Sequence, residues 1–305
     1  MRRFLSIFAA FLSVAISLSA QERFVNHPLP SSPDTLRILA VGNSFSDDGT
    51  EYLPQLLEAA GIHNVIVARL YIGGCSLERH CREYENDTKN YIYSKSTGSR
   101  WMKINGNASI RDGLRDERWD IVTIQETSGL SGIYDSYGKW IPRLLEIIRR
   151  EVPNPNLSVV WHETWAYAVN SDHGSFPLYG RNQETMYSGI VDCVERASSE
   201  FDIPVVIPSG DAVQIARGTR LNNRGSVSEG CKVYDLTRDG YHLNRQYGRY
   251  IAACTWFEAL IHPVLGTPVQ DNPYLLRDTE FSLNAEDAAL CRECAAQAVA
   301  RWNAK

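Results

Sequence analysis

The sequence LRILAVGNSFS, Leu36–Ser46, decides how the rest of the chain is interpreted. Its apolar half is too short for a helix and ends at Gly42, which is typical of a strand buried on both faces of a parallel sheet. The segment that follows, to about Ala60, has its leucines at helical spacing and then reaches a glycine. We therefore expect Ser44 at a strand-to-helix turn, where Gly42 allows a tight change of direction.

Four more apolar runs of the same character alternate with segments of helical periodicity. They lie at residues 65–72, 119–125, 157–161 and 204–207. Alternation of buried strands with helices predicts a parallel sheet with right-handed crossovers. We therefore expect an α/β fold with a five-stranded parallel sheet. We interpret the polar segment 76–118 as an excursion that carries one or two helices over the top of the sheet.

The length and composition fit a single α/β domain. The 305 residues are 44% hydrophobic and 22% charged, which are ordinary values for a globular protein. We assign residues 36–305 to one domain and residues 21–35, which contain three prolines, to an irregular lead-in. The formal net charge of -5 gives no basic surface, so we expect neither nucleic acid nor an anionic membrane surface as a partner.

The first twenty residues have the pattern of a secretory signal peptide. Two arginines precede an apolar stretch from Phe4 to Leu18, and Ala20 offers a small residue for cleavage. The apolar stretch is short for a membrane span, and no second one of its kind follows in the sequence. We expect residues 1–20 to be removed and the protein to be exported, to the periplasm or out of the cell, without a membrane span.

The sequence contains seven cysteines, an odd number that leaves at least one thiol unpaired within the chain. Cys291 and Cys294 have the spacing of half a redox or metal site, but no partner pair lies nearby in the sequence. Two thiols on one helix face is therefore the simpler interpretation, although a single disulfide stays open for an exported protein. Histidines at metal-ligand spacing are also absent, so we expect no metal and no other cofactor.

A catalytic serine needs a base within hydrogen-bond reach and a third group that orients the base. Asp239 and His242 lie three residues apart with Gly240 between them, so a tight loop can point both side chains the same way. We expect Asp239 to hold the Nδ1–H of His242 and to leave its Nε2 free for Ser44. Taken alone, Ser44 is more simply explained as a helix cap or a turn serine, and the downstream segment is what favours a catalytic role.

The segments Gly42–Ser46 and Asp239–Leu243 together resemble the first and last sequence blocks of the SGNH (GDSL-like) hydrolases. In detail they are similar to a bacterial branch defined as a domain of unknown function, whose members begin with GNSFS and often lie near glycan-degradation genes. The resemblance extends over residues 36–262. It implies a flavodoxin-like three-layer sandwich and ester hydrolysis by the serine, histidine and aspartate named above.

The resemblance also implies an oxyanion hole. The second block of the family contributes a loop glycine, for which Gly74 is the best match and Gly73 the alternative. The third block carries an asparagine whose amide binds the oxyanion, whereas this sequence has Gln125 there. We expect Gln125 to offer the same amide on a longer arm, beside the N–H groups of Ser44 and Gly74. Losing one such donor costs about 3–4 kcal/mol of barrier, so the departure bears on the rate.

Other residues near the predicted strand ends are candidates for contact with a substrate. Trp165 could stack on a sugar ring and His162 could touch the leaving alcohol, although both fit equally well as residues that only build the rim. The remaining candidates are Asn43, Gly73, Glu126 and Tyr241.

Three functions fit these patterns. The first is an exported serine esterase that removes O-acetyl or other short acyl groups from a glycan or another small ester. Fifteen tyrosines and seven tryptophans are a rich supply of aromatic faces for sugar rings. The second is a lipase or thioesterase of the same fold, which needs an apolar pocket that the sequence does not reveal. The third is a glycan-binding protein with weak turnover, for which the departure at Gln125 is the argument.

Overall fold

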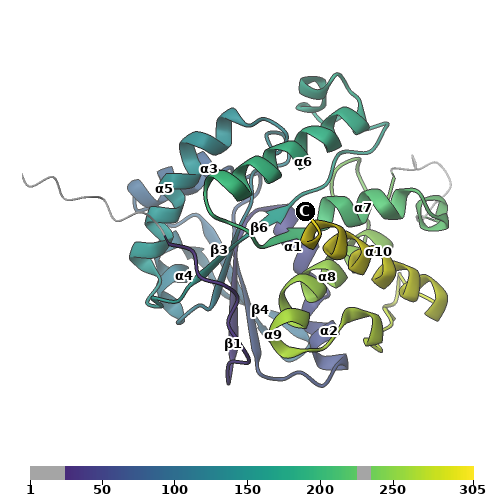
Figure 1. The fold of residues 1–305 in the computed structure, drawn as a ribbon, viewed down its shortest axis with the longest axis horizontal. Helices are drawn as coiled ribbons and strands as arrows, with labels where there is room; N and C mark the ends of the chain where they lie inside the picture. Colours follow the sequence, from purple (N-terminus) through teal and green to yellow (C-terminus); the bar gives the residue numbers. More distant parts are fainter. Residues whose placement is uncertain (1–24, 225–234) are drawn as a thin grey trace, which may run out of the picture.

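A seven-stranded sheet, ordered β4-β3-β2-β1-β5-β6-β7, lies between two layers of helices (Figure 1). These features come from a computed structural model that describes residues 25–224 and 235–305. The strands are β1 (Leu36–Gly42), β2 (Val65–Tyr71), β3 (Tyr91–Thr97), β4 (Arg100–Ala108), β5 (Ile121–Ile124), β6 (Ser158–Glu163) and β7 (Val206–Pro208).

The helices divide between the two faces of the sheet (Figure 1). On one side α3, α4 and α5 pack together, and on the other side α1, α7, α8 and α10 do so. The α-helices are α1 (Ser44–Thr50), α2 (Leu53–Ala59), α3 (Leu77–Glu85), α4 (Ile110–Asp116), α5 (Asp135–Glu151), α6 (Gln183–Glu200), α7 (Ser209–Arg217), α8 (Tyr247–Trp256), α9 (His262–Leu265) and α10 (Ala285–Asn303). The shorter helical turns are η1 (Phe176–Tyr179), η2 (Arg220–Arg224), η3 (Phe257–Ile261) and η4 (Val269–Asp271).

The five strands that the sequence predicts form the parallel part of the sheet. Strands β2, β1, β5, β6 and β7 are parallel neighbours throughout. In chain order this is the arrangement 2-1-3-4-5 of flavodoxin-like folds, so the predicted fold class is confirmed. Strands β5 and β6 are buried along their whole length, because helices cover both faces of the sheet.

The number of strands in the sheet differs from the prediction. Segment 76–118 contains two helices, as expected, but it also contains the antiparallel hairpin β3–β4, which extends the sheet beyond β2. Most side chains of β4 are exposed, and two register shifts interrupt its pairing, so no clear apolar alternation marks the hairpin in the sequence. Contact with the rest of the fold includes the Arg69 guanidinium, which lies 3.6 Å from the centre of the Trp101 ring.

The described residues include most of the cysteines of the chain. Six of the seven cysteines lie there, and all six are buried free thiols, including Cys291 and Cys294 on α10. Cys231 lies outside the described residues. Within residues 25–224 and 235–305, no cluster of three or more histidine, cysteine or carboxylate side chains could hold a metal ion.

The sequence predicts a signal peptide and no membrane span in the rest of the chain. The predicted signal peptide, residues 1–20, lies outside the described residues. Among the helices that are described, none combines the length and the apolar character that crossing a bilayer requires.

Candidate active site

Ser44 is the first residue of α1 and lies where β1 ends. Asn43 caps the helix, because its Oδ1 accepts the N–H of Phe45 at 3.0 Å. Gly42 is required for a steric reason rather than for backbone freedom, since a Cβ there would lie 2.5 Å from the Ser46 Oγ. The turn leaves Ser44 partly exposed in an otherwise buried segment.

The structure brings Ser44 together with His242 and Asp239. The Ser44 Oγ lies 2.8 Å from the Nε2 of His242, and the Nδ1 of His242 lies 2.7 Å from the Oδ2 of Asp239. Burial raises the pKa of Asp239, but the hydrogen bonds that it accepts from His242 outweigh burial and leave the pKa below its usual value. The carboxylate therefore stays ionised at neutral pH and favours a proton on the His242 Nδ1.

A tight loop aims His242 at the serine. Within it, Asp239 Oδ1 accepts the backbone N–H of His242 at 2.8 Å, so the two side chains share one side of the loop. Gly240 has a φ of 95°, a left-handed conformation that residues with a Cβ rarely adopt. The loop packs closely on the segment after β6, because the Gly240 carbonyl accepts the N–H of Ala168 at 2.9 Å and the Tyr241 carbonyl accepts the indole N–H of Trp165 at 2.7 Å.

Asp48 joins the serine helix to the histidine loop, and sequence reasoning did not single it out. Its carboxylate is fully buried and lies 3.0 Å from the Arg238 guanidinium and 2.7 Å from that of Arg249. It also accepts the backbone N–H of Leu243 at 2.9 Å, one residue after His242. In the sequence, Asp48 is simply the second aspartate after GNSFS, which suggests a solvated helix face. Only the fold reveals that Arg238 and Arg249 both contact Asp48.

The loop that follows β2 carries the predicted oxyanion glycines. Gly73 and Gly74 are exposed, and Gly74 has a φ of 60°. Asn43 holds this loop beside the start of α1, because its Nδ2 donates to the carbonyl of Cys75 at 2.9 Å. The N–H of Ser44 belongs to the first turn of the helix, where N–H groups have no acceptor within the helix itself. Two segments that can supply backbone donors therefore meet at Asn43.

The Gln125 side chain has other hydrogen-bond partners than the sequence predicts. Its side chain is buried, its Nε2 donates to the Asn43 Oδ1 at 3.0 Å, and its Oε1 lies 2.8 Å from the Nδ1 of His162. The amide is thus bonded to the protein at both its nitrogen and its oxygen. The structure uses it to hold the helix cap, whereas the sequence suggests a direct contact with an oxyanion.

Comparison with known proteins places the chain in a family. A model of the family described as "Domain of unknown function (DUF4886)" matches residues 37–298. The chain belongs to the DUF4886 family. A crystal structure of a DUF4886 family protein from Bacteroides uniformis is similar to it, with a TM-score of 0.77 and 38% sequence identity over 88% of this chain and 95% of that chain.

Two other solved structures are more distantly similar to this DUF4886 domain. A putative SGNH hydrolase from Slackia heliotrinireducens has a TM-score of 0.47 and 17% identity over 74% of this chain and 98% of that chain. The acetyl xylan esterase AlAXEase has a TM-score of 0.47 and 15% identity over 74% of this chain and 100% of that chain. No curated protein matches the chain.

Three residues of this DUF4886 domain that the sequence offers as candidates for substrate contact lie instead in its core. Trp165 stacks on Phe45 with ring centres 4.3 Å apart, and burial lowers the pKa of His162 to about 3, which keeps its imidazole neutral. Glu126 is buried and accepts the N–H groups of Leu77 and Thr127 at 3.1 and 2.7 Å. All three lie at or just after the ends of strands, as expected, but their side chains are buried in the core and do not face solvent.

An aromatic surface lies beside His242, and the sequence revealed only part of it. The ring of Tyr241, which is partly exposed, lies 4.2 Å from the imidazole of His242. His173 is also partly exposed, and its ring lies 4.6 Å from the ring of Tyr241 and 4.6 Å from that of Tyr167, which is fully buried. The segment that carries Tyr167 and His173 follows β6 without helical or strand periodicity, so only the fold could bring it here.

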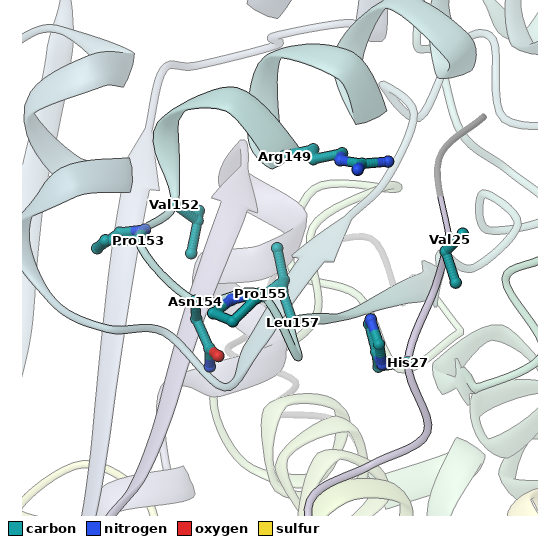
Figure 2. Close-up of a pocket in the computed structure, with 8 residues that line it drawn as sticks. All are labelled: Val25, His27, Arg149, Val152, Pro153, Asn154, Pro155 and Leu157. Carbon is teal, nitrogen blue, oxygen red and sulfur yellow. The ribbon is translucent and has the colours of Figure 1, made fainter. Parts of the chain in front are cut away.

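A separate groove opens at the opposite edge of the sheet (Figure 2). Its volume is about 390 Å³, and it lies where α5 leads into β6 and meets the start of the described chain. The residues that line it are Val25, His27, Arg149, Val152, Pro153, Asn154, Pro155 and Leu157. Ligands of open α/β sheets bind at the carboxyl ends of the strands, where Ser44 lies, so this groove is not part of the candidate active site.

Proposed function

We propose that this DUF4886 protein is a serine esterase in which Ser44, His242 and Asp239 act as a catalytic triad. One observation carries the proposal: the hydroxyl of a partly exposed serine lies 2.8 Å from one nitrogen of an imidazole whose other nitrogen lies 2.7 Å from a carboxylate. A serine hydroxyl is a weak nucleophile unless an adjacent base removes its proton. The hydrogen-bonded arrangement supplies that base, its orientation and its tautomer.

The first half of the reaction forms an acyl-enzyme. His242 Nε2 takes the proton of Ser44 Oγ as this oxygen attacks the carbonyl carbon of the ester. The carbonyl oxygen becomes an oxyanion, which the N–H groups of Ser44 and Gly74 would stabilise. The ester bond to the alcohol then breaks, and His242 gives its proton to the leaving alcohol.

The second half releases the acid. Water enters the site of the alcohol, and His242 removes a proton from it as the water oxygen attacks the acyl carbon. Collapse of the second tetrahedral intermediate breaks the bond to Ser44 Oγ, which takes the proton back from His242. Asp239 stays ionised throughout and stabilises the imidazolium that forms in both halves.

We further propose that the substrate is a glycan that carries O-acetyl or other short acyl groups. The aromatic surface beside His242, made by Tyr241 and His173 and backed by the buried ring of Tyr167, supports this proposal. Aromatic rings present an apolar face that suits the C–H face of a sugar, and Tyr241 also offers a hydroxyl. A sugar bound there would hold its acyl oxygen next to the imidazole that protonates the leaving alcohol.

The test of the nucleophile is hydrolysis of p-nitrophenyl acetate. We expect turnover by the wild type and a loss of about a thousandfold or more in kcat for Ser44→Ala. Asp239→Asn should lose about 10³–10⁴-fold in kcat, because an amide favours the wrong histidine tautomer. Asp172→Asn, at an exposed position near the site, is the matched control and should change little. Equal rates for wild type and Ser44→Ala would falsify the nucleophile assignment.

A glycan-binding protein with weak turnover is the alternative that one observation favours. Because the Gln125 amide is bonded to Asn43 and His162, it lacks the free orientation of a direct oxyanion donor. Calorimetry with an acetylated xylo-oligosaccharide separates the functions. Binding without release of acetate supports the alternative, whereas release of acetate supports the esterase. A series of p-nitrophenyl esters from acetate to palmitate then separates an esterase from a lipase, which would prefer the long chains.

We also propose that the protein is exported. The sequence of residues 1–20 supports this, with its positively charged start, its apolar stretch and the small residue Ala20. When the full chain is expressed in a bacterium with two membranes, we expect a periplasmic product. Its mass should correspond to a chain that begins at Gln21. Retention in the cytoplasm with residues 1–20 intact would contradict export.

A further inference from the structure

A line of side-chain hydrogen bonds crosses the sheet at the edge where Ser44 lies. The Ser209 Oγ, after β7, lies 3.1 Å from the Nε2 of His162, and the Nδ1 of His162 lies 2.8 Å from the Oε1 of Gln125. The Gln125 Nε2 donates to Asn43 Oδ1 at 3.0 Å, and the Asn43 Nδ2 donates to the Cys75 carbonyl at 2.9 Å. All four side chains are almost completely buried.

Two backbone groups at the Asn43 end set the direction of the whole line. The N–H of Phe45 can only donate and the carbonyl of Cys75 can only accept, so Asn43 must present its oxygen to the first and its nitrogen to the second. Gln125 must then turn its nitrogen toward Asn43 and its oxygen toward His162. A single inverted amide would place two donors or two acceptors face to face in a buried site, which is costly.

His162 is held in one tautomer as a result. Its Nδ1 carries the proton that Gln125 Oε1 accepts, and its Nε2 accepts the hydroxyl of Ser209. Burial keeps this imidazole neutral, since it lowers the pKa to about 3. The histidine therefore serves as a fixed donor and acceptor, and its nitrogens are not available to a leaving alcohol.

We propose that Gln125 and His162 are positioning residues that set the geometry of the oxyanion site through Asn43. Asn43 caps the helix that begins at Ser44 and holds the carbonyl of Cys75, which directly follows Gly74. The two N–H groups assigned to the oxyanion thus belong to the two segments that Asn43 joins. The longer arm of Gln125 has a role here, because it reaches the helix cap instead of the substrate.

The expected effect is on the chemical step. Oxyanion donors act only where charge develops in the transition state, so their displacement lowers kcat more than it raises KM. A misplacement of about 1 Å can cost about a hundredfold in rate. Because this inference rests on the proposed function, its experiment needs one readout that does not depend on turnover.

Three variants test the line by kinetics with p-nitrophenyl acetate. Gln125→Glu keeps the shape but turns a carboxylate oxygen toward Asn43, and we expect kcat to fall about tenfold to a hundredfold with KM nearly unchanged. His162→Leu removes the donor to Gln125 and should have the same effect. His162→Asn can place an amide N–H where Nδ1 was, so it should recover most of the rate. Thr164→Val is the matched control, because this buried hydroxyl at the end of β6 has no hydrogen-bond partner within the described residues.

The readout that is independent of turnover is the ¹⁵N NMR spectrum of the wild-type histidines. We expect the His162 signal, assigned by its loss in His162→Asn, to show a neutral imidazole protonated at Nδ1. A proton on Nε2 overturns the inference, and so does a wild-type kcat in both Gln125→Glu and His162→Leu. If His162→Leu does not fold, the kcat of Gln125→Glu is compared with that of Thr164→Val, and this comparison decides. If the wild type cleaves no ester, the proposed function fails together with the kinetic part of the inference. The tautomer of His162 then still decides which group donates and which accepts along the line of hydrogen bonds.

Discussion

At the scale of a single residue, Glu126 couples its ionisation to the stability of the fold. The carboxyl group is buried, and its Oε2 has no hydrogen-bond partner among the described residues. Burial raises the pKa of Glu126 to about 7, although two backbone N–H groups oppose the shift. Between the ordinary carboxyl pKa and this value, the folded state holds a proton that the unfolded state has released. Stability therefore falls as the pH rises through this window.

Glu126→Gln should remove this dependence on pH. The amide keeps an oxygen for the N–H groups of Leu77 and Thr127 and carries no charge at any pH. We expect the wild type to lose roughly 3 kcal/mol of unfolding free energy through this group between pH 5 and pH 8, and the variant to lose much less over the same range. Urea denaturation at both pH values measures this. Glu58→Gln, at an exposed position, should keep the wild-type slope, and equal slopes in all three proteins would contradict the assignment.

The sequence predicts the identity of the chemical groups better than their orientation. Ser44, Asp239 and His242 could be chosen because a strand-to-helix turn and a tight loop fix where such side chains point. His162 and Gln125 lie at the carboxyl ends of buried strands, so their position at the sheet edge was also predictable. Whether such a side chain turns to solvent or to the core depends on neighbours from distant segments, which is why a rim histidine and an oxyanion amide were expected where a buried line of hydrogen bonds exists.

At the scale of elements, a buried ion cluster joins α1 to the loop that carries His242. Asp48, on α1, lies between Arg238 of the loop and Arg249 of α8. The loop leads directly into α8, because the Asn244 side chain accepts the first N–H groups of that helix. Two segments nearly two hundred residues apart are therefore held in register by one carboxylate. The alignment of Ser44 with His242 depends on this cluster.

Asp48→Asn should reduce both stability and activity. Removing the charge leaves two arginines close together without their shared carboxylate, and breaking a buried ion pair typically costs about 3–5 kcal/mol. We expect a loss of that order in urea denaturation, and a fall in kcat for ester hydrolysis under conditions where the variant is still folded. Glu280→Gln breaks an exposed pair with Arg245 in the same region and should cost at most about 1 kcal/mol. Equally small losses for both variants would show that the cluster does not hold the loop.

At the scale of the whole molecule, the parallel core was predictable and the sheet extension was not. Continuous apolar runs mark β1, β5 and β6, because helices cover both faces of the sheet there. The hairpin β3–β4 lies at the edge, where Met102 and Ile104 are exposed among polar residues. An edge hairpin with irregular register has neither a buried run nor a strict alternation, so segment 76–118 resembled a helical excursion.

The burial of the cysteines predicts how the whole fold responds to a thiol reagent. Burial raises the pKa of Cys81 to about 12 and shifts the pKa of Cys75 and Cys254 in the same direction. Thiols that are buried and protonated react slowly. With Ellman's reagent and no added reducing agent, we expect the six described thiols to react only after unfolding in urea, so that a native chain shows at most one fast thiol. Fast reaction of two or more native thiols would contradict the described packing.

The most direct test of the catalytic account is covalent labelling of the serine with a fluorophosphonate, followed by peptide mass spectrometry. An activated Ser44 attacks phosphorus, fluoride leaves, and one phosphonyl group stays on the Ser44 oxygen. We predict a single adduct on the peptide that contains Ser44, no adduct in Ser44→Ala, and much slower labelling in His242→Ala. An unlabelled wild type, or equal labelling of wild type and Ser44→Ala, would contradict the claim that Ser44 and His242 form a nucleophile and its base.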